Sequence, residues 1–270
     1  MEAKVRLNPP NHFFNGEGVL SLVQISKDHP RYRSLVTREM MAERAKEGIV
    51  APTGLIAHGR GEAFDYLLGE RTTENARRAE LTAVAFLLDG NRPVISVNGN
   101  TAALCAQEVV ALAQATRSRI EINLFHRTEE RVEAVCSFME KAGAEEVLGR
   151  KADSLLPGIS SDRAKCTKEG IYSADVVLVP LEDGDRAEAL VKFGKKVIAI
   201  DLNPLSRTAN AAHVTIVDEV TRAIPAMIEM VPELRRNGDR RLALVNSFDN
   251  RRNLEEAMGI MRANLSSSRP

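Results

Sequence analysis

The chain has 270 residues, with 37 Lys and Arg against 37 Asp and Glu, so its formal net charge at pH 7 is zero. Hydrophobic residues make up 44% and charged residues 27%, which is ordinary for a globular protein and excludes a wholly disordered chain. The balanced charge argues against a nucleic-acid partner, and the apolar runs are too short to span a membrane.

The three cysteines, Cys105, Cys136 and Cys166, are widely spaced and form no CxxC pair. This spacing is typical neither of a metal site nor of a disulfide framework. Reduced thiols, together with an N-terminus that lacks the order of a signal peptide, lead us to expect a cytoplasmic protein.

We expect residues 1–24 to form a loosely ordered extension and residues 25–265 to form a single domain. Up to about residue 90 this domain is predicted to be helical. The predicted helices are 32–46, which ends before Gly48, then 61–68 and 73–88.

From about residue 91 to 231 the spacing of the hydrophobic residues changes, and short apolar runs typical of strands alternate with helical patterns. The predicted strands are the Val- and Ile-rich runs 93–97, 120–124, 175–180, 196–200 and 214–217. Helices are predicted between them at 102–115, 128–142, 186–193 and 221–230, and a loop at 149–170. This alternation predicts a Rossmann-like α/β fold: a mainly parallel sheet with helices on both faces, preceded by the N-terminal helical segment and followed by a helical tail.

Parallel sheets bind ligands beyond the carboxyl ends of their strands. Four segments there are rich in polar residues and glycine: SVNGN, NLFHRT, VPLEDGDR and AIDLNPLSRT. The first leads into a helix whose free N–H groups favour an anion, although Asn-Gly is also a common turn. None matches the G-x-G-x-x-G or P-loop motif.

Two of these loops carry acids. Glu182, Asp183 and Asp185 lie on a glycine-containing turn, which suits Mg²⁺ or, equally, the N-terminus of the following helix. Asp201 ends a strand, the usual position of an acid that binds ribose hydroxyls. Arg207 is then placed for a phosphate or for stacking on a base, with a helix cap or plain surface loop as the alternative.

A further cluster, GLIAHGRGEAFDY, precedes the sheet. Arg60 lies between two glycines, so we expect a turn whose backbone approaches a ligand closely at the start of a helix. His58 is a candidate general base, although a lone histidine in such a turn more often makes a structural hydrogen bond. Upstream, Arg31 and Arg38 add positive charge. Together these features favour an enzyme that uses ATP or another nucleotide.

Six longer strings are more specific: HPRYRSLVTRE, GLIAHGRGEAFDYLLGERT, PVISVNGNTAAL, IEINLFHRTEERV, GIYSADVVLVPLEDGDRAEAL and VIAIDLNPLSRTANAAHVTIVDEVTRAIP. Over residues 27 to 230 they resemble the archaeal 4-phosphopantoate–β-alanine ligase (phosphopantothenate synthetase) family. The resemblance implies a homodimeric, Rossmann-like enzyme that uses ATP with Mg²⁺ to join 4-phosphopantoate and β-alanine through an acyl-adenylate. The products would be 4′-phosphopantothenate, AMP and diphosphate, in archaeal coenzyme A biosynthesis.

The resemblance places the family's ATP contacts on matching positions, which are Arg38, Arg60, Asp201, Leu202, Asn203, Arg207, Thr208, Glu219 and Val220. Glu219 stands where the family more often has Asn, so a backbone contact would survive the change and a side-chain amide contact would not. Ala187 stands where the family usually has Thr, which removes a hydroxyl from the acidic loop.

The remaining site residues are assigned from loop position and chemistry. We expect Asn98, Asn100 and Arg186 to bind 4-phosphopantoate, and Asp183 and Asp185 to bind Mg²⁺. His58 would take the proton of the β-alanine amine, while Arg60 would act on the reacting phosphates.

Three alternatives stay open. A nicotinamide-dependent dehydrogenase would also use a strand-end acid, but the chain lacks G-x-G-x-x-G. A homologue that senses nucleotide without catalysis would keep the ATP contacts, and a sister enzyme would ligate unphosphorylated pantoate.

Overall fold

The computed structural model of the chain describes residues 25–29 and 31–267. The chain divides into two compact units, residues 1–39 and 40–270. Helix α1 (Tyr32–Lys46) begins in the first unit and has the predicted bounds. The extension expected over residues 1–24 lies outside the described residues. The larger unit, which begins at Met40, carries the sheet.

Within the described residues, the larger unit contains a parallel sheet of five strands in the order β2-β1-β5-β6-β7. The strands are β1 (Pro93–Val97), β2 (Arg119–Ile122), β5 (Val176–Pro180), β6 (Lys196–Ile200) and β7 (Val214–Ile216). Counted in chain order this is 2-1-3-4-5, the order of flavodoxin-like doubly wound folds. The winding direction reverses between β1 and β5, so this gap is the switch point of the sheet.

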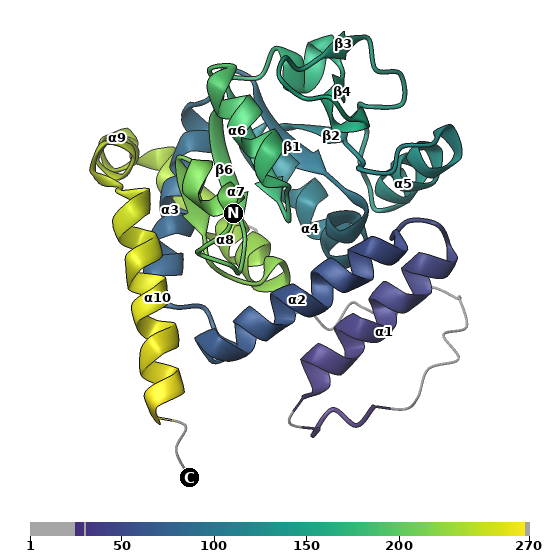
Figure 1. Cartoon of the computed structure of the whole chain (residues 1–270). Helices are drawn as coiled ribbons and strands as arrows, with labels where there is room; N and C mark the ends of the chain where they lie inside the picture. The colour runs from purple at the N-terminus through teal and green to yellow at the C-terminus, as the bar shows by residue number, and fades with distance from the viewer. Residues whose placement is uncertain (1–24, 30, 268–270) are drawn as a thin grey trace, which may run out of the picture. The chain divides into compact units, whose positions relative to one another are not determined.

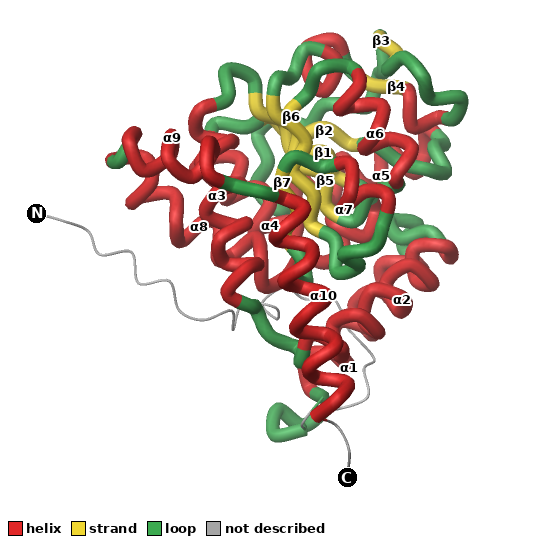
Figure 2. The backbone as a smooth tube through the Cα atoms, turned by 60° about the vertical axis from the view of Figure 1, so that its left-hand side comes forward, coloured by secondary structure: helices red, strands yellow, loops and turns green. Residues whose placement is uncertain are grey.

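Helices cover both faces of the sheet, as Figures 1 and 2 show. The described helices that follow α1 are α2 (Pro52–Leu68), α3 (Glu74–Asp89), α4 (Gly99–Thr116), α5 (Glu129–Lys141), α6 (Gly184–Lys192), α7 (Arg207–Ala211), α8 (Val220–Arg236), α9 (Gly238–Ser247) and α10 (Asn250–Ser267). Helices α3, α4, α5 and α8 pack on one face, and α6 packs on the other, against α7. The predicted α/β architecture is therefore confirmed.

The strands are continuous apolar runs because both of their faces are buried. In β6, Ile198 and Ile200 join the core under α3, α4 and α8, whereas Val197 and Ala199 join the smaller core under α6. A third cluster, centred on Leu202, joins α2 and α10 to the loop after β6.

Residues 149–172, of which 149–170 are predicted to be a loop, contain short ordered elements. These are β3 (Ser154–Leu155), the 3-10 turn η1 (Asp162–Ala164), β4 (Lys165–Cys166), which pairs antiparallel with β3, and the π-helical turn η2 (Lys168–Tyr172). The Glu121 carboxylate of β2 anchors them, because it accepts backbone hydrogen bonds from Thr167 at 2.7 Å and Ile171 at 2.6 Å. Strands of two residues are too short to show a period in sequence.

Helix α2 begins at Pro52, well before its predicted start at residue 61. The turn predicted around Arg60 is therefore wrong, since Gly59, Arg60 and Gly61 lie inside the helix. Pro52 suits a first turn because that position needs no N–H donor. Each glycine costs a helix about 1 kcal/mol relative to alanine, but packing of α2 against α4 and α10 outweighs this penalty.

Capping residues set several other helix starts. Thr73, Asn98, Thr128 and Ser206 each accept a hydrogen bond from the backbone N–H three residues further on. Helix α8 runs past its predicted end at residue 230, with two prolines inside it. Among the described residues, no helix combines the length and apolar character needed to cross a bilayer.

Gly99, at the start of α4, has no room for a side chain. A Cβ there would overlap the carbonyl oxygen of Ile49 and lie 2.8 Å from a guanidinium nitrogen of Arg131. Gly99→Ala should therefore lower the free energy of unfolding by about 1–3 kcal/mol, measured by thermal melting. Gly259→Ala, on α10 with nothing within 4 Å of the added Cβ, should raise it by up to about 1 kcal/mol. Equal melting temperatures for the two variants would contradict this packing.

Candidate functional site

The Asn98 side chain joins the carboxyl ends of β1 and β5 at the switch point. Its Nδ2 donates to the carbonyl oxygens of Pro180 at 3.0 Å and Leu181 at 2.9 Å. Its Oδ1 accepts from the backbone N–H and the hydroxyl of Thr101 at 3.0 and 3.1 Å. The amide thereby uses both of its donors and both of its acceptor positions. A ligand at this predicted substrate position would meet the backbone N–H groups of α4.

Asn100, also predicted to bind substrate, links α4 to α2. Its Nδ2 donates to the carbonyl oxygen of Gly54 at 2.8 Å, and a Cβ on Gly54 would overlap Asn100 Oδ1. This close approach holds α2 beside the carboxyl edge of the sheet, where α2 also carries His58 and Arg60. His58 is half-buried and Arg60 is exposed.

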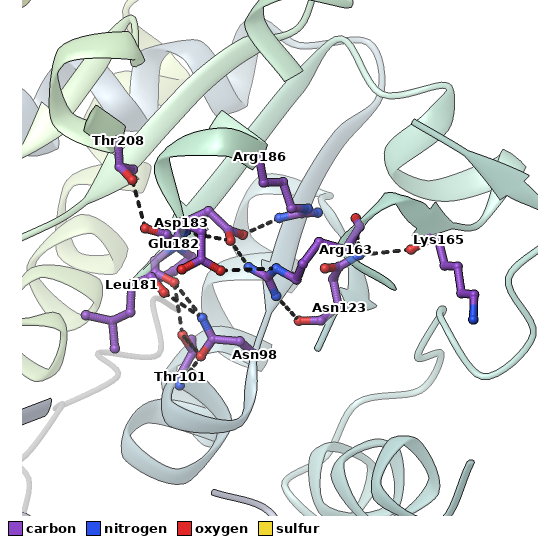
Figure 3. Close-up of polar contacts among 11 residues, drawn as sticks. Asn98, Thr101, Asn123, Arg163, Lys165, Leu181, Glu182, Asp183, Arg186 and Thr208 are labelled. Carbon is purple, nitrogen blue, oxygen red and sulfur yellow. Dashed lines mark hydrogen bonds and ion pairs between the residues drawn. The ribbon is translucent and has the colours of Figure 1, made fainter. Parts of the chain in front are cut away.

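A buried cluster of charges lies beyond the end of β5, as Figure 3 shows. The Glu182 carboxylate pairs with Arg163 of η1 and Arg186 of α6. The three side chains are 2%, 4% and 1% exposed respectively. Arg163 also donates from Nη1 to the carbonyl oxygen of Asn123 at 2.7 Å, which brings in the end of β2. We refer to Arg163 and Arg186 as the buried arginine pair.

The buried arginine pair has more donors than its partners accept. Arg186 Nε and Nη2 and Arg163 Nε make no hydrogen bond within the described part of the chain. Arg163 Nε lies 3.6 Å from an Asp183 carboxylate oxygen, which is an ion pair and not a hydrogen bond. Burial lowers the pKa of both guanidiniums, although arginine remains charged in proteins. Two cations therefore share one directly bonded buried carboxylate.

Sequence reasoning placed Arg186 at the substrate and did not single out Arg163. In the structure Arg186 points into the buried cluster and not to solvent. Arg163 belongs to the segment predicted to be a loop, so its arrival at the end of β5 depends on pairing between β3 and β4. A lone arginine in the string DRAKC was the only signal.

Asp201 shapes the loop that follows β6. Its Oδ1 accepts the Asn203 N–H at 2.9 Å and its Oδ2 accepts the Ser206 hydroxyl. Burial raises the pKa of this carboxyl, opposed by these two hydrogen bonds and by the charge of Arg60. Helix α2 thus brings Arg60 into electrostatic range of Asp201. Leu202 is buried in the third core, so any ligand contact there would use its backbone.

The loop after β6 is tied to the loop after β5. The Thr208 hydroxyl donates to the Glu182 carbonyl oxygen at 2.8 Å. Arg207 pairs with Asp185 at 2.5 Å and with Glu188 at 3.0 Å. These predicted ATP contacts therefore lie beside the acidic loop, where Arg207 already has two carboxylate partners.

Asp183 and Asp185, the predicted Mg²⁺ ligands, do not form a cage for a metal. Asp183 is 55% exposed and lies toward Arg163, and Asp185 pairs with Arg207. Over residues 25–29 and 31–267, no three His, Cys, Asp or Glu side chains are grouped to hold an ion. Because Mg²⁺ demands near-ideal octahedral coordination, two carboxylates already facing arginines do not fit a resident Mg²⁺ site.

A second buried network, which sequence reasoning missed, lies beyond β7. Arg222 of α8 pairs with Asp218 at 2.6 Å and with Asp65 of α2 at 2.5 Å. The Thr72 hydroxyl donates to Asp218 at 2.6 Å. The spacing of Asp218 and Arg222, one helical turn apart, was the available sequence signal. The network fixes α2 to the end of the sheet.

Glu219 and Val220, the last predicted ATP contacts, begin α8. The Glu219 carboxylate accepts the Thr221 N–H at 2.8 Å and caps the helix, and burial raises its pKa. The Asn that the family more often has is also a favoured cap, so Glu219 preserves this local structure. Val220 is buried in the core. Arg38 lies in α1, within the first compact unit.

Comparison with known proteins identifies the relatives of this chain. Residues 75–264 match the family model described as phosphopantothenate/pantothenate synthetase. A protein of Methanosarcina mazei named 4-phosphopantoate–β-alanine ligase is 52% identical over 90% of this chain and 96% of its own length. A protein of the same name from Methanospirillum hungatei is 58% identical over 78% of this chain and 86% of its own length. One from Thermococcus kodakarensis is 51% identical over 88% of this chain and 92% of its own length. The matched region extends beyond residue 230 into α10.

Glu80, buried in α3, should make stability depend on pH. Burial, and then the charge of Asp218, raise its pKa from 4.5 to about 8. The native state therefore holds this proton to a higher pH than the unfolded chain, so the free energy of unfolding should fall as pH rises from about 4.5 to about 8. Glu80→Gln should remove this fall of up to a few kcal/mol in urea titrations across that range. Glu229→Gln, at an exposed position, should retain it; identical pH profiles for the two variants would contradict the assignment.

Proposed function

We propose, from the premise that this chain belongs to the phosphopantothenate/pantothenate synthetase family, that it is an ATP-dependent ligase. It joins 4-phosphopantoate to β-alanine through a new C–N bond and releases 4′-phosphopantothenate, AMP and diphosphate. The names of its relatives support the two joined substrates. The product would enter the archaeal route to coenzyme A.

The observation that carries the proposal is the division of the carboxyl edge into two halves at the switch point. On the β6 side, Asp201 suits ribose hydroxyls and Arg60 suits phosphates. On the β1 and β5 side, the buried arginine pair supplies positive charge. Binding of two anions side by side is what the activation of a carboxylate by ATP requires.

The first step in this proposal is attack of the 4-phosphopantoate carboxylate on the α-phosphorus of ATP. It forms an acyl-adenylate and releases diphosphate. Because both reactants are anions, the protein contributes mainly by positioning them and offsetting their charge. Arg60 and Arg207 serve this purpose, and Arg207 exchanges its carboxylate partners for phosphate oxygens.

The nucleotide itself would be held by the loops after β6 and β7. Asp201 accepts the ribose hydroxyls, and its hydrogen bonds with Asn203 and Ser206 keep the loop in shape for that contact. The remaining contacts are assigned to Leu202, Asn203, Thr208, Glu219 and Val220. Mg²⁺ enters this proposal as part of the ATP substrate, and no ligand from the protein is assigned to it.

In the second step the β-alanine amine attacks the acyl carbon and AMP leaves. The amine must be neutral to attack, so a base has to take its proton. His58 is assigned this role, because α2 carries it on the same stretch as Arg60.

The enzyme is also proposed to be a homodimer. Leu55, Ile56 and Tyr66 of α2 are 37%, 72% and 41% exposed, which supplies apolar surface for a partner. Light scattering that gives the mass of a single chain would exclude the dimer.

Product analysis tests the reaction directly. Purified protein is supplied with Mg²⁺-ATP, β-alanine and either pantoate or 4-phosphopantoate. AMP and phosphopantothenate from the phosphorylated acid alone are expected. Release of ADP would indicate an acyl phosphate intermediate in place of the acyl-adenylate. ATP binding without turnover would indicate a nucleotide sensor.

Arg60→Ala should abolish AMP formation while leaving the thermal melt close to that of the wild type. The reason is that Arg60 is exposed and offsets charge at the reacting phosphates, so its loss removes catalysis more than packing. Arg251→Ala, at an exposed arginine on α10, is the matched control and should keep full activity. Near-normal turnover in Arg60→Ala would remove Arg60 from the site.

Asp201→Ala should raise the KM for ATP by about tenfold or more, which corresponds to a lost charge-assisted hydrogen bond. The KM for β-alanine should change far less, because the carboxylate is assigned to ribose. Ser206→Ala removes one contact that shapes the loop but keeps the Asp201 carboxylate, and should have the smaller effect. Equal effects of Asp201→Ala on both KM values would contradict the ribose role.

A further inference from the structure

We propose that the buried arginine pair is the receptor for the 4-phosphate of the phosphorylated acid, and that the Glu182 carboxylate occupies this receptor until the substrate displaces it. The choice of substrate rests on the proposed function. The existence of an anion receptor rests on the geometry alone. The proposed reaction uses the buried arginine pair only as a source of positive charge, and it assigns no role to Glu182.

The first argument is the number of free donors. Arg186 Nε, Arg186 Nη2 and Arg163 Nε are buried and make no hydrogen bond among the described residues. Buried donors in native proteins are nearly always satisfied. A carboxylate has two oxygens, and those of Glu182 are already engaged by one nitrogen from each arginine. A phosphate group offers three oxygens and can meet donors that a single carboxylate leaves over.

The second argument is charge. Among the described residues, Glu182 is the carboxylate that contacts both members of the buried arginine pair, and Asp183 lies 3.6 Å from Arg163 Nε. The nearby Glu121 is held instead by the backbone N–H groups of Thr167 and Ile171. A phosphate monoester carries a charge of about −1.5 to −2 at neutral pH. This charge matches that of two guanidinium groups. Arginine is also the residue best suited to bind phosphate through paired hydrogen bonds.

The third argument is place and approach. The cluster lies at the switch point, where doubly wound sheets bind ligands. Its solvent side is marked by Asp183, which is 55% exposed and 3.6 Å from Arg163 Nε. The loop after β6, which is assigned to ATP, lies beside this cluster, because the Thr208 hydroxyl donates to the Glu182 carbonyl oxygen.

The fourth argument concerns the residue before Glu182. Leu181 has a φ of 54°, the left-handed region that non-glycine residues rarely adopt. The Asn98 amide holds this conformation through the Leu181 carbonyl oxygen at 2.9 Å. Such strain is retained where the surroundings impose it and is common at ligand sites. The backbone that presents Glu182 to the buried arginine pair is therefore held in an uncommon conformation by its surroundings.

Inorganic phosphate is the probe that tests the receptor without ATP or β-alanine. Calorimetry on the full chain should detect phosphate binding against a chloride background. Glu182→Gln should bind phosphate about tenfold more tightly, because a competing charge is removed. Arg163→Lys should bind it about tenfold more weakly, because the planar fork is lost. Arg251→Ala, at an exposed arginine on α10, should bind phosphate as the wild type does.

Substrate preference is the second readout. In Arg163→Lys the ratio of kcat/KM for 4-phosphopantoate over pantoate should fall about tenfold to a hundredfold. Arg150→Gln, at an exposed arginine that pairs with Glu133 and Glu140 away from the site, is the control and should keep the wild-type ratio. A thermal melt accompanies each variant. If Glu182→Gln fails to fold, the comparison of phosphate binding between the wild type and Arg163→Lys still tests the receptor.

Two outcomes would overturn the inference. One is no phosphate binding to the wild type, or equal binding to Arg163→Lys. The other is an unchanged preference for 4-phosphopantoate in Arg163→Lys, which would leave the buried cluster a purely structural clamp while the ligase proposal stands. Phosphate binding in a protein that makes no AMP from either acid would instead overturn the proposed function and keep the receptor.

Discussion

Glu182 holds three segments in place, two through its carboxylate, which is buried between two guanidinium groups, and one through its backbone carbonyl oxygen. Arg163 brings the segment 149–172 and Arg186 brings α6, while the Glu182 carbonyl oxygen accepts from Thr208 of α7. Removing one partner of a buried ion pair typically costs about 3–5 kcal/mol because the remaining charge is left unpaired. The loops after β5 and β6 therefore keep one arrangement relative to each other.

The two buried networks give the carboxyl edge an electrostatic asymmetry. At the switch point two arginines face the Glu182 carboxylate and, at 3.6 Å, Asp183, so the paired charges balance. Beyond β7, Arg222 faces both Asp218 and Asp65, so negative charge is in excess. Asp201 follows β6, the strand that lies between β5 and β7. An anionic acid is favoured on the first side, and hydroxyl groups that donate hydrogen bonds are favoured on the second.

Prediction from sequence succeeded where the signal was local. The bounds of β1, β6 and α1 follow from short apolar or amphipathic runs, and Thr128 marks the start of α5 as a cap. It was wrong for α2, because glycines on either side of Arg60 suggested a turn that packing against other helices overrides. It also missed the order in 149–172, where each element is too short to have a period.

The sequence by itself determined the alternation of strands and helices, hence the parallel sheet, and it determined that polar loops follow the strands. Its longer strings also indicated the family. Only the tertiary structure decided which of those polar groups face one another: that Asn98 joins β1 to β5, that Arg186 is buried, and that Arg163 meets Glu182. Local patterns reflect the backbone and its nearest neighbours, whereas these contacts join residues far apart in the chain. They arise because charges removed from water must find partners wherever packing brings them together.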